Sequence, residues 1–478
     1  MLGLVFGATT LAVSTVLAAF MGGLALGSAL AGRFASRIRK PIAVYGLMEI
    51  GIAIYALLVP LLFRWIDQAY VLIWQHFQPG FFAFSLWRFV LSGLVLLVPT
   101  TLMGATLPVL AALRSNTNAV ARLYAFNLAG AIIGTLAAGF VLLPVLGVRT
   151  TISVAATVNV VVGITAIFLL RQTNVRANVI SDPVNPEENP ANSFWYFAAL
   201  VSGFVTISTQ VSWTRVLTMV IGSSTYAFSI VVALFLIGLA AGAWWIARKD
   251  RSETLRRTIL QVEVLTTISL ALSMFVLNKL PAVLVTLGLR LQPSSWLGLL
   301  ALQILCATLL ILAPAVLMGM VMPLVLVWAG SDQTKAVART GRSYAVNTIG
   351  AIAGAFITGF VLIPKTSTRF TLILAAVCCL VVAAVAYRPN SVRDPALKRS
   401  LAIGATPILA IMLFLIVPPM NLADLSVGAY DSLVRVLAQT REGPPNDSNQ
   451  TSQVHELLMY DEGPTATVSV RKDLNTVS

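Results

Sequence analysis

The chain has 478 residues, of which 58% are hydrophobic and only 10% are charged. Because soluble globular chains carry about 25% charged residues, this composition excludes a soluble enzyme for residues 1 to about 418. The formal net charge of +14 does not indicate nucleic-acid binding, since the 32 basic residues lie mostly in short stretches between apolar runs, as in membrane proteins.

Apolar segments long enough to cross a bilayer, which takes about 20 residues, recur along the chain. The sequence predicts twelve: 2–32, 41–63, 87–113, 124–146, 150–170, 195–215, 222–247, 258–278, 296–329, 343–364, 369–387 and 400–418. The first has no basic n-region and is too long for a signal-peptide core, so it is interpreted as a retained helix. Residues 64–84 combine aromatic rings with few charges, which predicts a segment lying at the membrane interface. Residues 171–193 are polar and proline-rich, as expected of a linker.

The distribution of basic residues predicts an orientation. The connections after the odd-numbered segments carry 20 Lys or Arg, whereas the connections on the opposite side carry eight before the tail begins. The richer side is expected to be cytoplasmic. Met1 and the tail 419–478 are then expected outside, and the placement of the tail depends on a crossing by residues 400–418.

The sequence contains two copies of one unit. The stretch that begins at Leu2 matches the stretch that begins at Leu217, so that Gly7 pairs with Gly222 and Gly23 with Gly238. PTTLMGATLP (99–108) matches PAVLMGMVMP (314–323), and YAFNLAGAIIGTLAAGFVLLP (124–144) matches YAVNTIGAIAGAFITGFVLIP (344–364).

The second copy begins one helix earlier, because residues 195–215 have no counterpart in the first. A complete unit would have six helices, and an even number of crossings makes the two copies parallel, as in the halves of major-facilitator transporters. The predicted fold is an all-α polytopic membrane protein with about 12 transmembrane helices in two parallel six-helix-type repeats, the first lacking its first helix, and a short soluble tail. The predicted divisions are 1–170 (repeat 1, five helices), 171–193 (linker), 194–387 (repeat 2, six helices), 400–418 (an additional helix) and 419–478 (tail).

Several motifs together resemble those of bacterial fused major-facilitator and spermidine-synthase membrane proteins. They are SGFVTISTQVSWTR (202–215), GSSTYAF (222–228), MGGLALGSALAGR (21–33), the MGxxxP and YAxNxxGAxxG elements of both copies, and LLMYDEGPTATVSVRKD (457–473). The resemblance covers nearly the whole chain. It implies a major-facilitator-like membrane region followed by a spermidine-synthase-like domain.

Only the start of such a domain stands in this sequence. A strand and a turn at Glu462, Gly463 and Pro464 are predicted, whereas the glycine-rich βα turn of a nucleotide site and a downstream acidic residue are missing. No catalytic residue, cofactor or metal ligand is therefore assigned, and the chain as it stands is not expected to be an enzyme. A split gene, a truncation and a natural loss remain alternatives.

Glu49 and Glu263 are candidate pathway residues, because acidic groups at membrane depth are costly. They occupy nearly matching positions in the two copies. A pair of carboxylates suits the binding of a cationic amine or a proton relay. The alternative is that each lies near a helix N-terminus, where the helix dipole and loop arginines stabilise it.

Further candidates recur within glycine-rich helices. Tyr124 and Asn127 match Tyr344 and Asn347, and the asparagines are expected to lie opposite each other near the central interface. They either line a polar cavity or hydrogen-bond across close helix contacts. Gln210 is a candidate too, although the resembled family commonly has glutamate at that place.

The sequence leads to three hypotheses of function. The first is a multi-pass protein of the bacterial inner membrane that handles a small amine or cationic solute linked to polyamine metabolism. The second is a non-transporting anchor or assembly subunit. It is favoured because the loop GRFASRIRK (32–40) resembles the major-facilitator pattern G-x-x-x-D-R-x-G-R-R but has Ser36 at the acidic position, and because Gln210 also replaces an acid. The third is the membrane part of a split aminopropyltransferase. The expected partners are lipid, a small cationic solute and a protein completing the synthase-like domain, but no nucleic acid.

Overall fold

The computed structural model describes most of the chain. The described residues are 10–34, 38, 40–78, 81–111, 117–172, 190–222, 225–248, 255–293, 295–331, 336–387, 395–420, 429, 433–434, 436–437, 455–462 and 467–473. Most of the predicted linker 171–193, Ser36 and much of the tail 419–478 lie outside these ranges.

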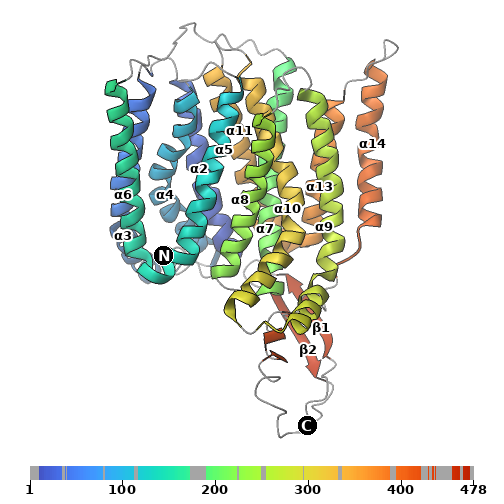
Figure 1. Cartoon of the computed structure of the whole chain (residues 1–478). Coiled ribbons are helices and arrows are strands. Elements are labelled where there is room, and N and C mark those ends of the chain that lie inside the picture. The colour runs from blue at the N-terminus through green and yellow to red at the C-terminus, as the bar shows by residue number, and fades with distance from the viewer. Residues whose placement is uncertain are drawn as a thin grey trace.

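Helices run side by side through the molecule, and a small pair of strands lies beyond one end of the bundle (Figure 1). The first copy contains α2 (Thr10–Arg33), α3 (Pro41–Phe77), α4 (Phe81–Ala111), α5 (Thr117–Leu136), η2 (Ala137–Leu142) and α6 (Leu143–Gln172). The second contains α7 (Pro190–Ile221), α8 (Thr225–Arg248), α9 (Leu255–Leu291), α10 (Trp296–Ala329), α11 (Ala336–Ile357), η3 (Thr358–Leu362), α12 (Ile363–Lys365) and α13 (Thr368–Ala386). They are followed by α14 (Pro395–Ile416), β1 (His455–Glu462) and β2 (Thr467–Asp473).

Apart from residues at their ends, the predicted membrane-spanning segments are helical where the structure describes them. Within the described ranges, nine helical stretches are long and apolar enough to cross a membrane. The stretch Arg122–Phe168 joins α5, η2 and α6, and the chain reverses near Gly147, whose φ of 71° leaves the helical region. The predicted fold class, an all-helical polytopic membrane protein built from two parallel repeats, is confirmed.

The two copies pack alike. In the first, α2 packs on α4, α3 on α6 and α3 on α4; in the second, the matching helices form the pairs α8–α10, α9–α13 and α9–α10. Glycines at matching positions allow these contacts. A Cβ added to Gly104 would lie 2.6 Å from the Cα of Leu24, and one added to Gly319 would lie 2.5 Å from the Cα of Leu239. Any side chain there would push the helices apart, so these glycines are required by close packing.

Two helices are longer than the sequence predicted. α3 and α9 each contain 37 residues, about 55 Å at 1.5 Å per residue, which exceeds the roughly 30 Å of hydrocarbon. Residues 64–77, predicted as an interfacial segment, continue α3 without interruption. Both helices end alike, at Gln78 and Gln292, whose φ angles of 37° and 41° are left-handed. Several aromatic rings of residues 64–77 lie at the surface, with Trp65 59% and Phe77 79% exposed, whereas Tyr70 is buried.

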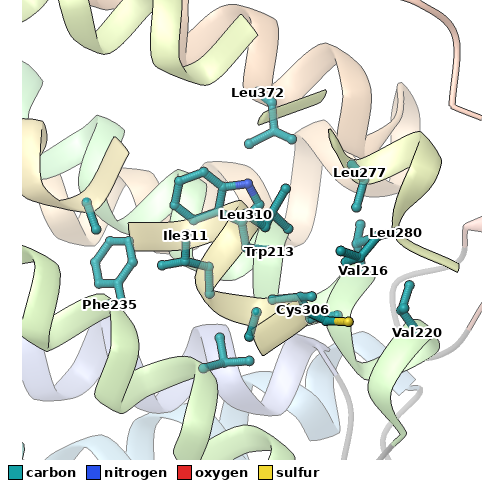
Figure 2. Packing of buried hydrophobic residues seen from close by; sticks show 14 of the residues in the cluster. Trp213, Val216, Val220, Phe235, Leu277, Leu280, Cys306, Leu310, Ile311 and Leu372 are labelled. Atoms are coloured by element: carbon teal, nitrogen blue, oxygen red, sulfur yellow. The ribbon is translucent and has the colours of Figure 1, made fainter. Parts of the chain in front are cut away.

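The largest apolar core lies around α7 in the second copy. Trp213 and Leu217 of α7 are fully buried, and the Nε2 atom of Gln303 in α10 donates a hydrogen bond of 2.7 Å to the carbonyl of Ile221 at the end of α7. Figure 2 shows Trp213, Val216 and Val220 among side chains of the neighbouring helices: Phe235, Leu277, Leu280, Cys306, Leu310, Ile311 and Leu372. Since lipid is as apolar as leucine, tight packing rather than water exclusion holds these helices together within the membrane.

The strands of the tail form an antiparallel hairpin. His455 pairs with Asp473 and Glu462 with Thr467, with an irregularity between Leu457 and Met459. The strands lie near the end of the bundle where α9 joins α10 (Figure 1). On the way to the tail, Asn278 Nδ2 donates a hydrogen bond of 2.9 Å to the carbonyl of Pro419.

Candidate functional site

The two copies meet along two matching seams. One seam joins α2 to α11 and the other joins α5 to α8. Since α2 matches α8 and α5 matches α11, a pseudo-twofold rotation exchanges the two seams, as in an interface between identical subunits. The contact between the copies is therefore the place where a path shared by both would lie.

The α2–α11 seam is tight at the end of the bundle where α2 ends and α11 begins. A Cβ added to Gly32 would lie 3.3 Å from the Cα of Gly341, and one added to Gly341 would lie 2.9 Å from the Cα of Gly32. The two backbones approach each other this closely because neither residue has a side chain. The seam is thus formed by small residues, as is common where membrane helices pack.

Two candidate residues meet between the copies. The rings of Tyr124 in α5 and Tyr344 in α11 lie 6.2 Å apart at 76°, an edge-to-face contact. Each is at the same place in its own copy, so the pair lies where the pseudo-twofold axis brings equivalent residues together. The sequence predicted both tyrosines but not their contact. Thr340 and Ser343 of α11 are also fully buried, and their hydroxyl groups have no hydrogen-bond partner in the described part of the chain.

The opposite end of the seams contains two π-helical turns. η2 and η3 interrupt their helices at matching places. A Cβ added to Gly139 of η2 would lie 2.8 Å from the Cβ of Ser229 in α8, and the rings of Phe140 and Tyr226 lie 5.6 Å apart. Single π-turns inside α-helices occur frequently at functional sites. These turns lie against the other copy.

The two asparagines differ in their surroundings. Asn347 Nδ2 donates a hydrogen bond of 2.9 Å to the carbonyl of Ala199 in α7, within its own copy. Asn127 is exposed on α5. The expectation that they lie opposite each other across the central interface is wrong, because the amide of Asn347 is directed to α7. Of the two sequence-based alternatives, a polar cavity or a hydrogen bond across a close helix contact, the geometry of Asn347 fits the second.

The two carboxylates each face a helix of their own copy. Glu49 is half-buried and accepts a hydrogen bond from the hydroxyl of Tyr45, one turn earlier in α3, and a Cβ added to Gly163 of α6 would lie 3.4 Å from its Cβ. Glu263 is 2% exposed and accepts a hydrogen bond from the thiol of Cys379 in α13.

The positions of the carboxylates also exclude one sequence-based alternative. Each is the ninth residue of its helix, since α3 begins at Pro41 and α9 at Leu255. The stabilising effect of a helix dipole falls off within the first turn, so it does not explain these two residues. Their partners are instead the side chains of Tyr45 and Cys379.

Among the remaining ionisable or polar groups of α7, Gln210 is partly exposed and Arg215 is 7% exposed. The predicted segment 195–215 ended at Arg215, and this arginine was counted among the eight basic residues of the less basic side of the membrane. The helix continues to Ile221, which places this arginine within the packed bundle. The triplet Trp-Thr-Arg, which directly follows an apolar run, was the feature of the sequence that could have indicated a buried arginine here. In the described ranges, no group of three or more His, Cys, Asp or Glu gathers to hold a metal ion.

Comparisons with known proteins give similarity to solved structures only. No family model matches the chain, and no curated protein matches it. The chain is similar to the fucose:proton symporter FucP of E. coli, with 14% identity, a TM-score of 0.41, and 79% of this chain and 98% of that chain covered. It is also similar to a major-facilitator transporter, FucP in the outward conformation, with 13% identity and a TM-score of 0.40 over the same shares of the two chains.

Proposed function

We propose that this protein is a solute transporter of the major-facilitator type, in which the two helical copies rock against each other. The arrangement of the copies carries this proposal. They are parallel and matched, and they meet along two exchangeable seams, as required for alternate opening toward the two sides of a membrane. Since membrane transporters bind solute near the interface between repeats, the space between the copies is the proposed path.

The tyrosine pair and the nearby hydroxyl groups are the proposed solute contacts. Tyr124 and Tyr344 come from different copies, so movement of one copy against the other would change the contacts of a solute held by both rings. Aromatic faces attract cations, and hydroxyl groups such as those of Thr340 and Ser343 accept hydrogen bonds from an ammonium group. A small amine or other cationic solute fits these groups. The link to polyamine metabolism rests on the resemblance of the sequence.

The carboxylates have a different place in this proposal than in the sequence hypothesis. Glu49 and Glu263 face helices of their own copies and have partners there. Their role as a solute or proton pathway stays a prediction, and so does that of Gln210. The proposal assigns first contact with the solute to the tyrosines.

Uptake by the purified protein in proteoliposomes tests the proposal. Labelled putrescine and spermidine should accumulate faster than in vesicles without protein, and Tyr124→Ala should slow this uptake. Uptake equal to that of empty vesicles for these amines and for neutral solutes of the same size would refute transport.

An anchor or assembly subunit is the second candidate. One observation favours it: the two repeat-matched carboxylates form contacts within their own copies. Under this alternative the protein would take up no solute and would purify with a stoichiometric partner. A membrane part of a split aminopropyltransferase remains the third candidate, in which the hairpin β1–β2 would be completed by another chain.

A further inference from the structure

The second copy shows how α7 is held by its neighbours. Besides the hydrogen bond from Asn347 to Ala199, a Cβ added to Gly354 of α11 would lie 2.6 Å from the carbonyl oxygen of Phe204 in α7. Gly350 is in similarly close contact with the backbone of Leu200. On α10, the thioether of Met318 accepts a hydrogen bond of 3.6 Å from the hydroxyl of Thr209. Four residues on two helices thus form the surface on which α7 lies.

The same four residues are present in the first copy: Met103 on α4 and Asn127, Gly130 and Gly134 on α5. Here, within the described part of the chain, no helix corresponding to α7 contacts them. A Cβ added to Gly130 or to Gly134 would meet no atom within 4 Å, Asn127 is exposed, and Met103 is 38% exposed where Met318 is 4% exposed. We call these four residues the open face.

The open face is unusual for a surface in contact with lipid. Membrane helices place glycine and asparagine where another helix packs, because small residues allow close approach and a polar side chain needs a partner. Gly130 and Gly134 of α5 are exposed, whereas the matching Gly350 and Gly354 of α11 are buried. The sequence of this face of α5 is therefore that of a packed face, whereas the described residues leave it uncovered although α5 packs on α8 elsewhere.

We propose that a further transmembrane helix of the α7 type covers the open face and leads directly into α2. The repeat specifies its chemistry. It would be apolar, about 30 residues long, with a backbone carbonyl toward Asn127, close backbone contact at the two glycines, and a hydroxyl toward Met103 as Thr209 offers to Met318.

The repeat also indicates where this helix belongs in the chain. α7 ends at Ile221 and α8 begins at Thr225. Since α2 matches α8, the helix on the open face would precede α2 through a similarly short connection. The sequence repeat itself extends back to Leu2, which pairs with Leu217 in α7. This inference does not depend on transport, because it concerns only the packing of the first copy.

Leucine substitutions in the protein purified from its native membranes test the covering of the face. Gly130→Leu and Gly134→Leu should each lower the melting temperature by several degrees, as Gly354→Leu should in the occupied copy. Gly404→Leu in α14, where nothing lies within 4 Å, is the matched control and should not lower it. If the open face meets only lipid, the first two substitutions will be neutral or stabilising, because leucine favours helices more than glycine does; that result would overturn the proposal.

Cross-linking tests the origin of the helix. Ala131, exposed beside Gly130, can be replaced in Ala131→Cys and labelled with a benzophenone maleimide, with the labelled unsubstituted protein and Gly404→Cys as controls. The proposal predicts a cross-link within one polypeptide, between position 131 and a segment that precedes α2. A cross-link to a different polypeptide or to a second copy of this chain would contradict it, and so would labelling of lipid alone.

Discussion

Tyr124 and Tyr344, which are 220 positions apart in the sequence, meet edge to face with their ring centroids 6.2 Å apart. They are the same residue of the repeated unit, so the contact joins each copy to the equivalent point of the other. An edge-to-face pair contributes about 0.5–1.5 kcal/mol beyond its buried area.

A double-mutant cycle measures that contact. Tyr124→Leu and Tyr344→Leu should each lower the free energy of unfolding, and the double variant should lose less than the sum by about 0.5–1.5 kcal/mol. Denaturation monitored by tryptophan fluorescence gives the four stabilities. Phe356→Leu with Phe360→Leu, a stacked pair at 4.6 Å within one helical run, is a matched control for aromatic coupling inside one copy. Strict additivity of the two tyrosine variants would show that the rings do not interact.

The buried carboxylate Glu263 should respond to the loss of its donor. Cys379→Ala removes the thiol that hydrogen-bonds it and should lower the free energy of unfolding by about 1–3 kcal/mol, the cost of leaving a buried polar group unsatisfied. Cys378→Ala, the neighbouring and less buried cysteine, should cost less. Thermal denaturation of both variants checks this. An equal loss in the two would mean that the effect is one of volume and not of the hydrogen bond.

Glutamine variants separate stability from solute handling at the two acids. Because Glu49 and Glu263 face helices of their own copies, Glu49→Gln and Glu263→Gln should leave amine binding unchanged and should change only the melting temperature. Isothermal titration with spermidine, alongside melting curves, provides both quantities. A ten- to hundredfold loss of affinity in either variant would match a lost charge-assisted contact of about 1.5–3 kcal/mol. That result would mean that the carboxylate contacts the solute.

Arg369 should hold the end of α14. One of its guanidinium nitrogens donates to the carbonyls of Phe414 and Val417 at 2.8 and 2.7 Å, and the group lies 4.6 Å from the ring centre of Phe414. A cation at a helix C-terminus satisfies carbonyls that have no partner in the helix. Arg369→Met should speed hydrogen exchange in residues 404–417 about tenfold or more, whereas the nearby Lys365→Met should not. Unchanged exchange in Arg369→Met would show that α14 is held by other contacts.

The orientation predicted from basic residues can be checked with reporters. Fusions after Arg251 and after Ser478 should report opposite sides of the membrane, with Arg251 in the cytoplasm, if α14, which lies between α13 and the tail and runs beside part of the bundle, crosses the membrane as the sequence predicts (Figure 1). Cytoplasmic signals from both fusions would mean that α14 does not cross.

Much of the fold could be predicted from the sequence, because hydropathy and internal repetition are both visible in the sequence itself. Apolar length marks each helix, and matched glycines such as Gly104 and Gly319 mark the contacts within each copy. The full length of α3 was missed because hydropathy detects only the part of a helix that lies in lipid. The pair Pro79-Gly80, which follows the end of α3 at Phe77, was the available stop signal.

The candidate site was less predictable, because its residues depend on neighbours that no local pattern specifies. Asn127 and Asn347 are identical in type and position within the repeat, yet within the described part of the chain only Asn347 has a hydrogen-bond partner on a neighbouring helix, whereas Asn127 is exposed. Glu49 and Glu263 match in position, but their hydrogen bonds come from Tyr45 of the same helix in one case and from Cys379 of another helix in the other. Repetition specifies the residue and its helix, whereas the partner is specified by tertiary packing.

A cross-link across the α2–α11 seam tests the central claim, that the two copies must move against each other, most directly. In Gly32→Cys/Gly341→Cys the two backbones, which are in contact at these glycines, must separate slightly to admit the side chains, and a disulfide can then join α2 to α11. Uptake of labelled spermidine into proteoliposomes is measured after oxidation and again after reduction, with each single cysteine variant as a control. The account predicts that oxidation abolishes uptake in the double variant alone and that reduction restores it. Undiminished uptake by fully cross-linked protein would contradict the account.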